Sequence, residues 1–279
     1  MRTVDGRTRT YRVHVPPRID SSALVPVVLA LHGGVGSGAQ FERNSGFDAL
    51  ADRNRFVVVY PDGIPIGGAS VFARGRVWNG GKCCGPAATG DVDDVTFLTR
   101  VIDSVRGRFH GDPRRVFVTG HSNGAIMAYR LACERADRIA AIGVQAGTLE
   151  IPTCSPSRPV SVLHIHGTAD RNIPIGGGRG IGMSGTDFFP PQQAVEILAG
   201  ADRCPARPTV RVDAENSDVS TRTWSPCGQG TAVEFVTVTG APHAWMGHPS
   251  STVASPAGSR HEGYDSSAAI WTFFAAHGR

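Results

Sequence analysis

The sequence has 279 residues, and its hydrophobic fraction of 41% is enough for a large folded core. The formal net charge is only +4, and the basic residues, almost all arginine, are scattered and not interleaved with aromatic residues. A nucleic-acid partner is therefore not expected. Since no run of about 18 apolar residues occurs, no membrane span is expected either. With no internal repeat and no linker, residues 1–279 are expected to form a single domain.

Six cysteines, an even number, occur at positions 83, 84, 133, 154, 204 and 227. None belongs to a C-x-x-C pair or a cluster with zinc-ligand spacing, so disulfides are favoured and no metal or cofactor is expected. Disulfides indicate an oxidising compartment. The chain starts Met-Arg-Thr-Val-Asp-Gly, with no apolar signal segment. Two explanations stay open: a secreted protein whose leader has been removed, which we favour, or a cytoplasmic chain with free cysteines.

The cysteine positions suggest a pairing. Cys204 and Cys227 flank one local region and are expected to form a bridge, although about 15 complete pairings are possible. A bond between the adjacent residues Cys83 and Cys84 would be strained. We therefore expect each of them to bond to a different one of the two remaining cysteines, Cys133 and Cys154. These bonds would tether a long glycine-rich loop at 67–91 to the helix expected at 125–135.

Apolar patterns predict strands that alternate with helices. Continuous runs such as PVVLAL at 26–31 and FVVVY at 56–60 indicate buried strands, whereas TYRVHV at 10–15 alternates and indicates an antiparallel strand. Further strands are expected at 116–119, 139–144, 160–166 and 233–238, with a hairpin or short strands at 209–212 and 222–224. Helices are expected at 39–53, 93–109, 125–135, 192–199 and 265–277. The pattern predicts an α/β fold, a mostly parallel central sheet flanked by helices on both faces.

The segment Gly-His-Ser-Asn-Gly at 120–124 joins a predicted strand directly to a predicted helix. A sharp turn in this context is where a G-x-S-x-G motif presents a nucleophilic serine. Gly120 and Gly124 have no Cβ, which lets the helix and the strand cross closely. We therefore predict that Ser122 is a nucleophile; the alternative is an ordinary serine in a glycine-rich turn.

A nucleophilic serine needs a histidine that accepts its proton and a carboxylate that fixes the histidine tautomer. Asp170 directly follows the strand expected at 160–166, and His243 follows the strand expected at 233–238. Together with Ser122, they give the serine, acid, histidine order of α/β-hydrolases. Asp170 is predicted as the acid and His243 as the base. The rivals are His248 and His261 for the base, and Asp187 and Asp202 for the acid.

Two further sets of residues are expected near the serine. His32-Gly33-Gly34 follows the strand at 26–31, and glycine there lets a backbone N–H approach a developing oxyanion. The predicted oxyanion hole consists of the amides of Gly34 and Asn123. Trp78 and Trp245 are candidates for substrate binding, with packing in the core as the alternative for each.

Five motifs together resemble the polyhydroxybutyrate-depolymerase/feruloyl-esterase (LpqC-like) group of α/β-hydrolases: LHGG, GHSNGA, HGTAD, APHAW and a CC-G loop preceded by WN. The similarity runs over nearly the whole chain. It implies an α/β-hydrolase fold, ester hydrolysis without a cofactor, and export in many members. Through the matching motifs, the resemblance implies that Ser122 is the nucleophile, Asp170 the acid and His243 the base. It also implies that the amide of Gly34 completes the oxyanion hole. A glycine-rich loop at 176–189 and Met246 depart from the family pattern and leave the substrate open.

The sequence thus predicts a serine carboxylic-ester hydrolase that forms an acyl-serine intermediate. Short-chain, aryl (feruloyl-type) and hydroxyalkanoate esters are the expected substrates, as small molecules or polymers. A serine peptidase on the same fold is an alternative, but a propeller or large cap domain is missing. The other alternative is a catalytically silent polymer- or carbohydrate-binding protein, which the intact serine, aspartate and histidine disfavour. The sequence does not predict the oligomeric state.

Overall fold

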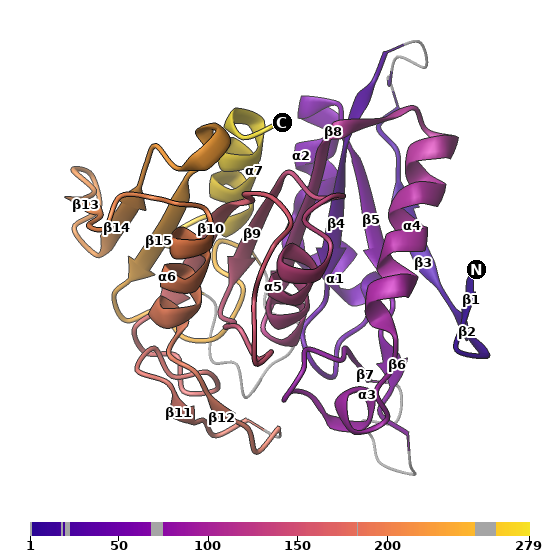
Figure 1. Cartoon of the computed structure of the whole chain (residues 1–279), viewed down its shortest axis with the longest axis horizontal. Helices are drawn as coiled ribbons and strands as arrows, with labels where there is room; N and C mark the ends of the chain where they lie inside the picture. The colour runs from indigo at the N-terminus through magenta and orange to yellow at the C-terminus, as the bar shows by residue number, and fades with distance from the viewer. Residues whose placement is uncertain (1, 18, 20–22, 68–74, 183, 249–260) are drawn as a thin grey trace.

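A nine-stranded sheet forms the centre of the molecule (Figure 1). The computed structural model describes residues 2–17, 19, 23–67, 75–182, 184–248 and 261–279. The strand order is β13-β14-β15-β10-β9-β8-β4-β5-β3. Six neighbouring strands are parallel: β5 (Val57–Pro61), β4 (Val25–Leu31), β8 (Gly111–His121), β9 (Ala141–Gln145), β10 (Ser161–Gly167) and β15 (Val233–Val238). The prediction of a mostly parallel sheet is confirmed.

Antiparallel strands lie at both edges of this sheet. At one edge β3 (Tyr11–His14) pairs with β5, in agreement with its alternating sequence. At the other edge β14 (Val219–Trp224) pairs with β15, and β13 (Thr209–Val212) pairs with β14. The region for which the sequence allowed either a hairpin or short strands is therefore an antiparallel hairpin.

Helices cover both faces of the sheet, as predicted. One face carries α4 (Asp94–Arg108), α5 (Asn123–Glu134) and α6 (Pro191–Ala201), and the other carries α1 (Gly38–Ser45), α2 (Phe47–Asn54) and α7 (Ser266–Ala276) (Figure 1). Successive side chains of a strand point to opposite faces. In β4, Val27 and Leu29 belong to the apolar cluster on one face, while Val28 and Ala30 belong to the cluster on the other. Burial on both faces explains why this strand is apolar throughout.

The helix predicted at 39–53 is in fact two helices, because the chain turns at Gly46. This glycine has φ 73°, in the left-handed region that glycine adopts without steric cost. A Cβ at Gly46 would also overlap the ring of His248. Apolar residues on both sides keep a helical spacing, so the sequence alone did not reveal the break.

Short elements lie in the loops and at the N-terminus. Between β5 and α4 these are β6 (Ile64–Pro65), β7 (Arg76–Val77) and α3 (Gly85–Thr89), and between β10 and α6 they are β11 (Gly178–Arg179) and β12 (Asp187–Phe188). The others are β1 (Arg2–Val4), β2 (Arg7–Arg9) and η1 (Gly228–Gly230). Among the residues that the structure describes, no helix is both long and apolar enough to cross a membrane.

Candidate active site

Ser122 occupies the sharp turn between β8 and α5. Its backbone angles, φ 55° and ψ −121°, fall in a sparsely populated region, as expected for a serine in this motif. The surrounding backbone leaves room only for glycine on either side. A Cβ on Gly120 would overlap the carbonyl oxygen of Gly124, and a Cβ on Gly124 would overlap that of Leu31. The two glycines therefore let α5 start directly against β8 and β4, with Ser122 at the N-terminus of the helix.

Ser122, His243 and Asp170 form one hydrogen-bonded chain. His243 Nε2 lies 2.8 Å from Ser122 Oγ, and His243 Nδ1 lies 2.7 Å from Asp170 Oδ2. Because a carboxylate oxygen only accepts, Nδ1 carries the hydrogen, and Nε2 of the neutral ring is left to accept from the serine hydroxyl. The three residues follow β8, β15 and β10, and the carboxyl ends of parallel strands meet at one edge of the sheet.

Asp170 is buried, with 4% of its surface exposed, and yet it is held in the charged form. Burial by itself would raise the pKa of this carboxyl group, but the electrostatic interaction with the His243 ring and the hydrogen bonds that the carboxylate accepts keep its pKa below the ordinary value. Asp170 Oδ1 accepts from the backbone N–H groups of Asn172 at 2.8 Å and Ile173 at 2.9 Å. The carboxylate is therefore oriented by its own loop and directs its second oxygen to His243.

Two side chains hold the backbone of the loop that carries His243. His121 Nε2 donates to the carbonyl oxygen of His243 at 2.6 Å, and Gln145 Nε2 donates to that of Ala244 at 2.7 Å. Gln145 Oε1 accepts in turn from the N–H of Met246 at 3.2 Å. His121 belongs to the serine motif, so its place near the site could be predicted. Gln145 could not be predicted, because a glutamine at the end of a strand has no distinctive pattern before its loop partner is known.

The rival residues lie elsewhere. His248 and His261 belong to the segment that precedes α7, and His248 pairs with Asp265 at 3.1 Å. Asp202, at the end of α6, accepts from the N–H of Val160 at 3.0 Å and 3.2 Å. Asp187 is exposed on β12. Of the candidates from the sequence, the structure brings Asp170 and His243 to Ser122.

The glycine loop after β4 lies beside the serine turn. A Cβ on Gly33 would lie 3.4 Å from Ser122 Cβ, and a Cβ on Gly34 would lie 3.7 Å from Asn123 Cβ. Within the described ranges of the chain, no protein acceptor is bonded to the backbone N–H of Gly34 or Asn123. The loop that carries Gly34 therefore lies against the serine turn that carries Asn123.

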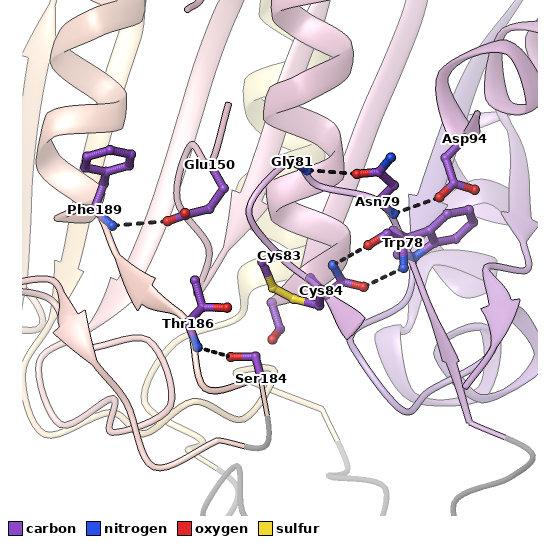
Figure 2. Close-up of a disulfide and its surroundings, with 12 residues drawn as sticks. Trp78, Asn79, Gly81, Cys83, Cys84, Asp94, Glu150, Ser184, Thr186 and Phe189 are labelled. Atoms are coloured by element: carbon purple, nitrogen blue, oxygen red, sulfur yellow. Dashed lines mark hydrogen bonds between the residues drawn. A yellow bond between two sulfur atoms is a disulfide. The ribbon is translucent and has the colours of Figure 1, made fainter. Parts of the chain in front are cut away.

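The Asn123 side chain is fixed by the backbone of the Trp78 loop. Asn123 Oδ1 accepts from the N–H of Trp78 at 2.7 Å, and Asn123 Nδ2 donates to the Trp78 carbonyl at 3.0 Å. The N–H of Cys84 donates to the same carbonyl at 3.3 Å. Figure 2 shows Trp78 and Cys84 side by side in this loop. The orientation of Asn123 therefore depends on the loop between β7 and α3.

The prediction that Trp78 and Trp245 bind substrate is wrong, because both rings are packed in the interior. Trp78 is 0% exposed, and its Nε1 donates to the carbonyl of His32 at 3.0 Å. Trp245 is 5% exposed, lies edge-on to the ring of Phe41, and donates from Nε1 to Ser267 Oγ at 3.0 Å. Each tryptophan thus supports a loop of the site from within the core, which is the alternative that the sequence left open.

Three disulfides use all six cysteines. The bond between Cys204 and Cys227 is the predicted one. The pairing predicted for the other four cysteines is wrong. Cys133, at the end of α5, bonds to Cys154, and the two Cα atoms lie 4.9 Å apart. The adjacent cysteines Cys83 and Cys84 therefore bond to each other (Figure 2). The long loop is consequently not tethered to α5 by a disulfide, and the hydrogen bonds of Asn123 join it there instead.

The Cys83–Cys84 disulfide belongs to an apolar cluster with Ile126, Ile173 and Phe188. This cluster borders the hydrogen-bonded chain at two points. The N–H of Ile126 donates to the Ser122 carbonyl at 3.0 Å, and the N–H of Ile173 donates to Asp170. Next to Phe188, Phe189 is 37% exposed, and the Lys82 ammonium lies 4.3 Å from its ring centroid. No group of His, Cys, Asp and Glu in the described part of the chain could hold a metal ion.

The family model described as "Putative esterase" matches residues 3–242. The chain is 32% identical over 270 residues to Putative esterase NocK of Nocardia uniformis subsp. tsuyamanensis, covering 88% of this chain and 72% of that protein. It is 27% identical over 243 residues to Feruloyl esterase B of Piromyces equi, covering 85% of this chain and 42% of that protein. The chain therefore spans less than half the length of the Piromyces relative.

Solved structures agree on the fold. Acetyl xylan esterase from Aspergillus awamori has a TM-score of 0.60 with this chain at 17% identity, covering 84% of this chain and 88% of that one. Thermogutta terrifontis esterase 2 has a TM-score of 0.58 with this chain at 16% identity, covering 99% of this chain and 92% of that one. The fold is the α/β-hydrolase fold, as expected. Since the family model covers most of the sequence, the chain belongs to this esterase family.

Proposed function

We propose that the chain is a serine esterase that hydrolyses carboxylic esters through an acyl intermediate on Ser122. The observation that carries the proposal is the hydrogen-bonded chain from Ser122 Oγ through His243 to the charged, buried Asp170. The strained backbone of Ser122 and membership of the esterase family support it.

In this mechanism Ser122 Oγ attacks the ester carbonyl carbon, and His243 Nε2 takes the hydroxyl proton. The amides of Gly34 and Asn123 donate to the oxyanion of the tetrahedral intermediate. His243 then gives its proton to the leaving alcohol, and the acyl group stays on Ser122. A water molecule next loses a proton to His243 and attacks the acyl carbon. The bond from the acyl carbon to Ser122 Oγ then breaks, His243 returns the proton to Oγ, and the acid leaves. Asp170 remains ionised throughout and stabilises the imidazolium.

Labelling with a fluorophosphonate separates this proposal from a silent binding protein. The reagent should phosphonylate Ser122 in the native protein, and peptide mapping should find the adduct on that residue alone. The Ser122→Ala protein is the control and should remain unlabelled. If the folded native protein is not labelled, the esterase proposal is contradicted and a catalytically silent binding protein is favoured.

We further propose that the substrate carries a neutral acyl group that is short or aromatic. The support is the apolar cluster around the Cys83–Cys84 disulfide, which packs against the triad, together with the ring of Phe189, which follows Phe188 of this cluster and is 37% exposed. Relatives named Feruloyl esterase B and Poly(3-hydroxyalkanoate) depolymerase C fit this range. Rates on methyl ferulate, p-nitrophenyl acetate, p-nitrophenyl butyrate and a hydroxybutyrate oligomer would rank the candidates, and a matched anilide would report peptidase-like activity. Faster cleavage of the anilide than of the esters would contradict an esterase.

We also propose that the protein works in an oxidising compartment, outside the cytoplasm. The support is that all six cysteines are paired in disulfides. Non-reducing peptide mapping of protein from its native source tests this directly. Three disulfide-linked species are expected, and six free thiols would contradict the proposal.

A further inference from the structure

A second hydrogen-bonded chain runs between α5 and β10, beside the triad. Tyr129 Oη lies 2.7 Å from His164 Nδ1, His164 Nε2 lies 3.0 Å from His166 Nδ1, and His166 Nε2 lies 2.9 Å from the carbonyl oxygen of Ile173. Tyr129, His164 and His166 are all 0% exposed. The chain thus joins the helix that begins after Ser122 to the loop that contains Asp170.

The hydrogen bonds of this chain can point in only one direction. The carbonyl of Ile173 only accepts, so His166 Nε2 carries a hydrogen. Burial lowers the pKa of His166, so the ring is neutral at pH 7 and its Nδ1 is an acceptor. His164 Nε2 must then donate to it, and His164 Nδ1, on a ring whose pKa burial lowers still further, accepts from the Tyr129 hydroxyl. Both rings are therefore held in the Nε2–H tautomer.

His166 lies next to the Asp170 carboxylate and is linked to it through Ile173. Its Nε2 lies 3.5 Å from Asp170 Oδ2, the oxygen that also accepts from His243. Ile173, which accepts the shorter bond from His166, donates its own N–H to Asp170 Oδ1 at 2.9 Å. His166 Nε2 therefore lies close to one carboxylate oxygen, and the backbone that its N–H anchors holds the other.

Packing alone does not account for two histidines in this strand. β10 is buried along its whole length, and its neighbouring positions are the apolar residues Val162, Leu163 and Ile165. Burying an imidazole costs free energy unless its nitrogens are hydrogen-bonded, whereas an apolar side chain carries no such cost. A strand that only filled the core would be at least as stable with apolar residues at 164 and 166.

We propose that His166 is a positioning residue for ester hydrolysis and that His164 and Tyr129 fix its tautomer. The inference rests on the proposed function, because it takes Asp170 to be the acid of the triad. Without the His166 N–H, the Ile173 carbonyl loses its donor, and the loop whose N–H groups orient the carboxylate towards His243 is held less firmly. The neutral His243 ring then loses the orientation that leaves Nε2 facing Ser122. The effect falls on kcat, since His166 is buried and does not contact the reacting atoms.

Two substitutions at one position separate positioning from packing. His166→Leu keeps an apolar filling but removes the N–H, whereas His166→Gln keeps an N–H that can reach the Ile173 carbonyl. We expect His166→Leu to lower kcat by about 10- to 100-fold per active site titrated with fluorophosphonate, with KM nearly unchanged, and His166→Gln to recover most of the loss. The matched control is His14→Leu on the edge strand β3, where the histidine pairs with Asp52, and it should keep the parent kcat. A His166→Leu kcat per titrated site equal to that of the parent would overturn the proposal.

A measurement that needs no turnover keeps the inference testable if His166→Leu does not fold. In the Ser122→Ala protein labelled with 15N-histidine, two-bond 15N–1H spectra distinguish the two tautomers of a neutral imidazole. We expect the Nε2–H tautomer at His164 and His166 at pH 7, and a mixture at His164 in Tyr129→Phe. The Nδ1–H tautomer at His166 would overturn the inference whatever the activity. If the tautomers are as expected but the protein with Ser122 intact cleaves no ester, the proposed function is contradicted and the tautomer assignment stands.

Discussion

At the scale of single residues, burial keeps two histidines near the site neutral. His32 is fully buried: its Nδ1 lies 2.7 Å from the Gly33 carbonyl oxygen, and its Nε2 accepts from the N–H of Gly63 at 3.0 Å. A proton on Nε2 would break the second bond. Burial lowers the pKa of His32 to about 4, and burial likewise lowers the pKa of His121 to about 3.

This arrangement makes stability depend on pH. The pKa of His32 in the folded state is below that of an unfolded histidine, about 6.5, so the unfolded chain takes up the proton first. The stability that the neutral ring contributes is fully present above about pH 6.5 and is lost as the pH falls towards about 4. In urea titrations, His32→Gln should lose less free energy of unfolding between about pH 7 and 4.5 than the parent does, by on the order of 2 kcal/mol. An equal loss in both proteins would show that His32 titrates normally.

At the scale of elements, the serine turn depends on the close crossing of α5 with β4. In Gly124→Ala the new Cβ would overlap the Leu31 carbonyl oxygen, which is backbone and cannot move aside cheaply. We expect the substitution to destabilise the fold by on the order of 2 kcal/mol or more, and to lower ester hydrolysis through displacement of Ser122. The measurements are urea unfolding and turnover of p-nitrophenyl acetate.

Gly107→Ala is the matched control for that prediction. Gly107 lies in α4, and a Cβ there would meet nothing within 4 Å. The same added methyl group should therefore stabilise the protein by about 0.5–1 kcal/mol through helix propensity, without a change in turnover. Equal effects of the two substitutions would mean that the crossing at Gly124 is looser than described.

The three disulfides should differ in what they contribute to stability. In the chain-entropy account, a bond stabilises by restricting the unfolded chain, and the restriction grows with the length of the closed loop. Cys133–Cys154 and Cys204–Cys227 span 21 and 23 residues, so replacing either pair by alanine should cost about 3 kcal/mol. Cys83–Cys84 spans a sequence separation of 1 and closes no loop. Urea unfolding should therefore rank its double-alanine variant as the least destabilised, and a cost as large as the other two would refute the ranking.

At the scale of the whole molecule, the sequence was most informative where one residue type serves one purpose. Continuous apolar runs identified the parallel strands, and Gly120, Ser122 and Gly124 identified the serine turn, because only these residues fit those positions. The sequence was least informative where the conformation or burial of a residue depends on a contact with a residue distant in sequence. The break at Gly46 involves the ring of His248, and the buried place of Trp78 depends on the His32 carbonyl.

The disulfide pairing and Gln145 illustrate the same limit. Whether Cys133 bonds to Cys154 or to Cys84 depends on how α5 and the loop after β9 meet, and spacing along the chain does not contain that information. Gln145 supports the His243 loop across a separation of about a hundred residues. Such contacts follow from tertiary packing, which the spacing of residues along the chain does not determine.

The central claim is that His243 is the base that activates Ser122, and the most direct test compares two histidines on neighbouring segments. His243→Ala and His248→Ala each remove one imidazole, but only His243 lies against Ser122, whereas His248 pairs with Asp265. For p-nitrophenyl acetate, with folding verified by circular dichroism, His243→Ala should lower kcat by on the order of 10⁴ and His248→Ala should leave it nearly unchanged. Near-normal turnover in His243→Ala, or a comparable loss in His248→Ala, would contradict the account.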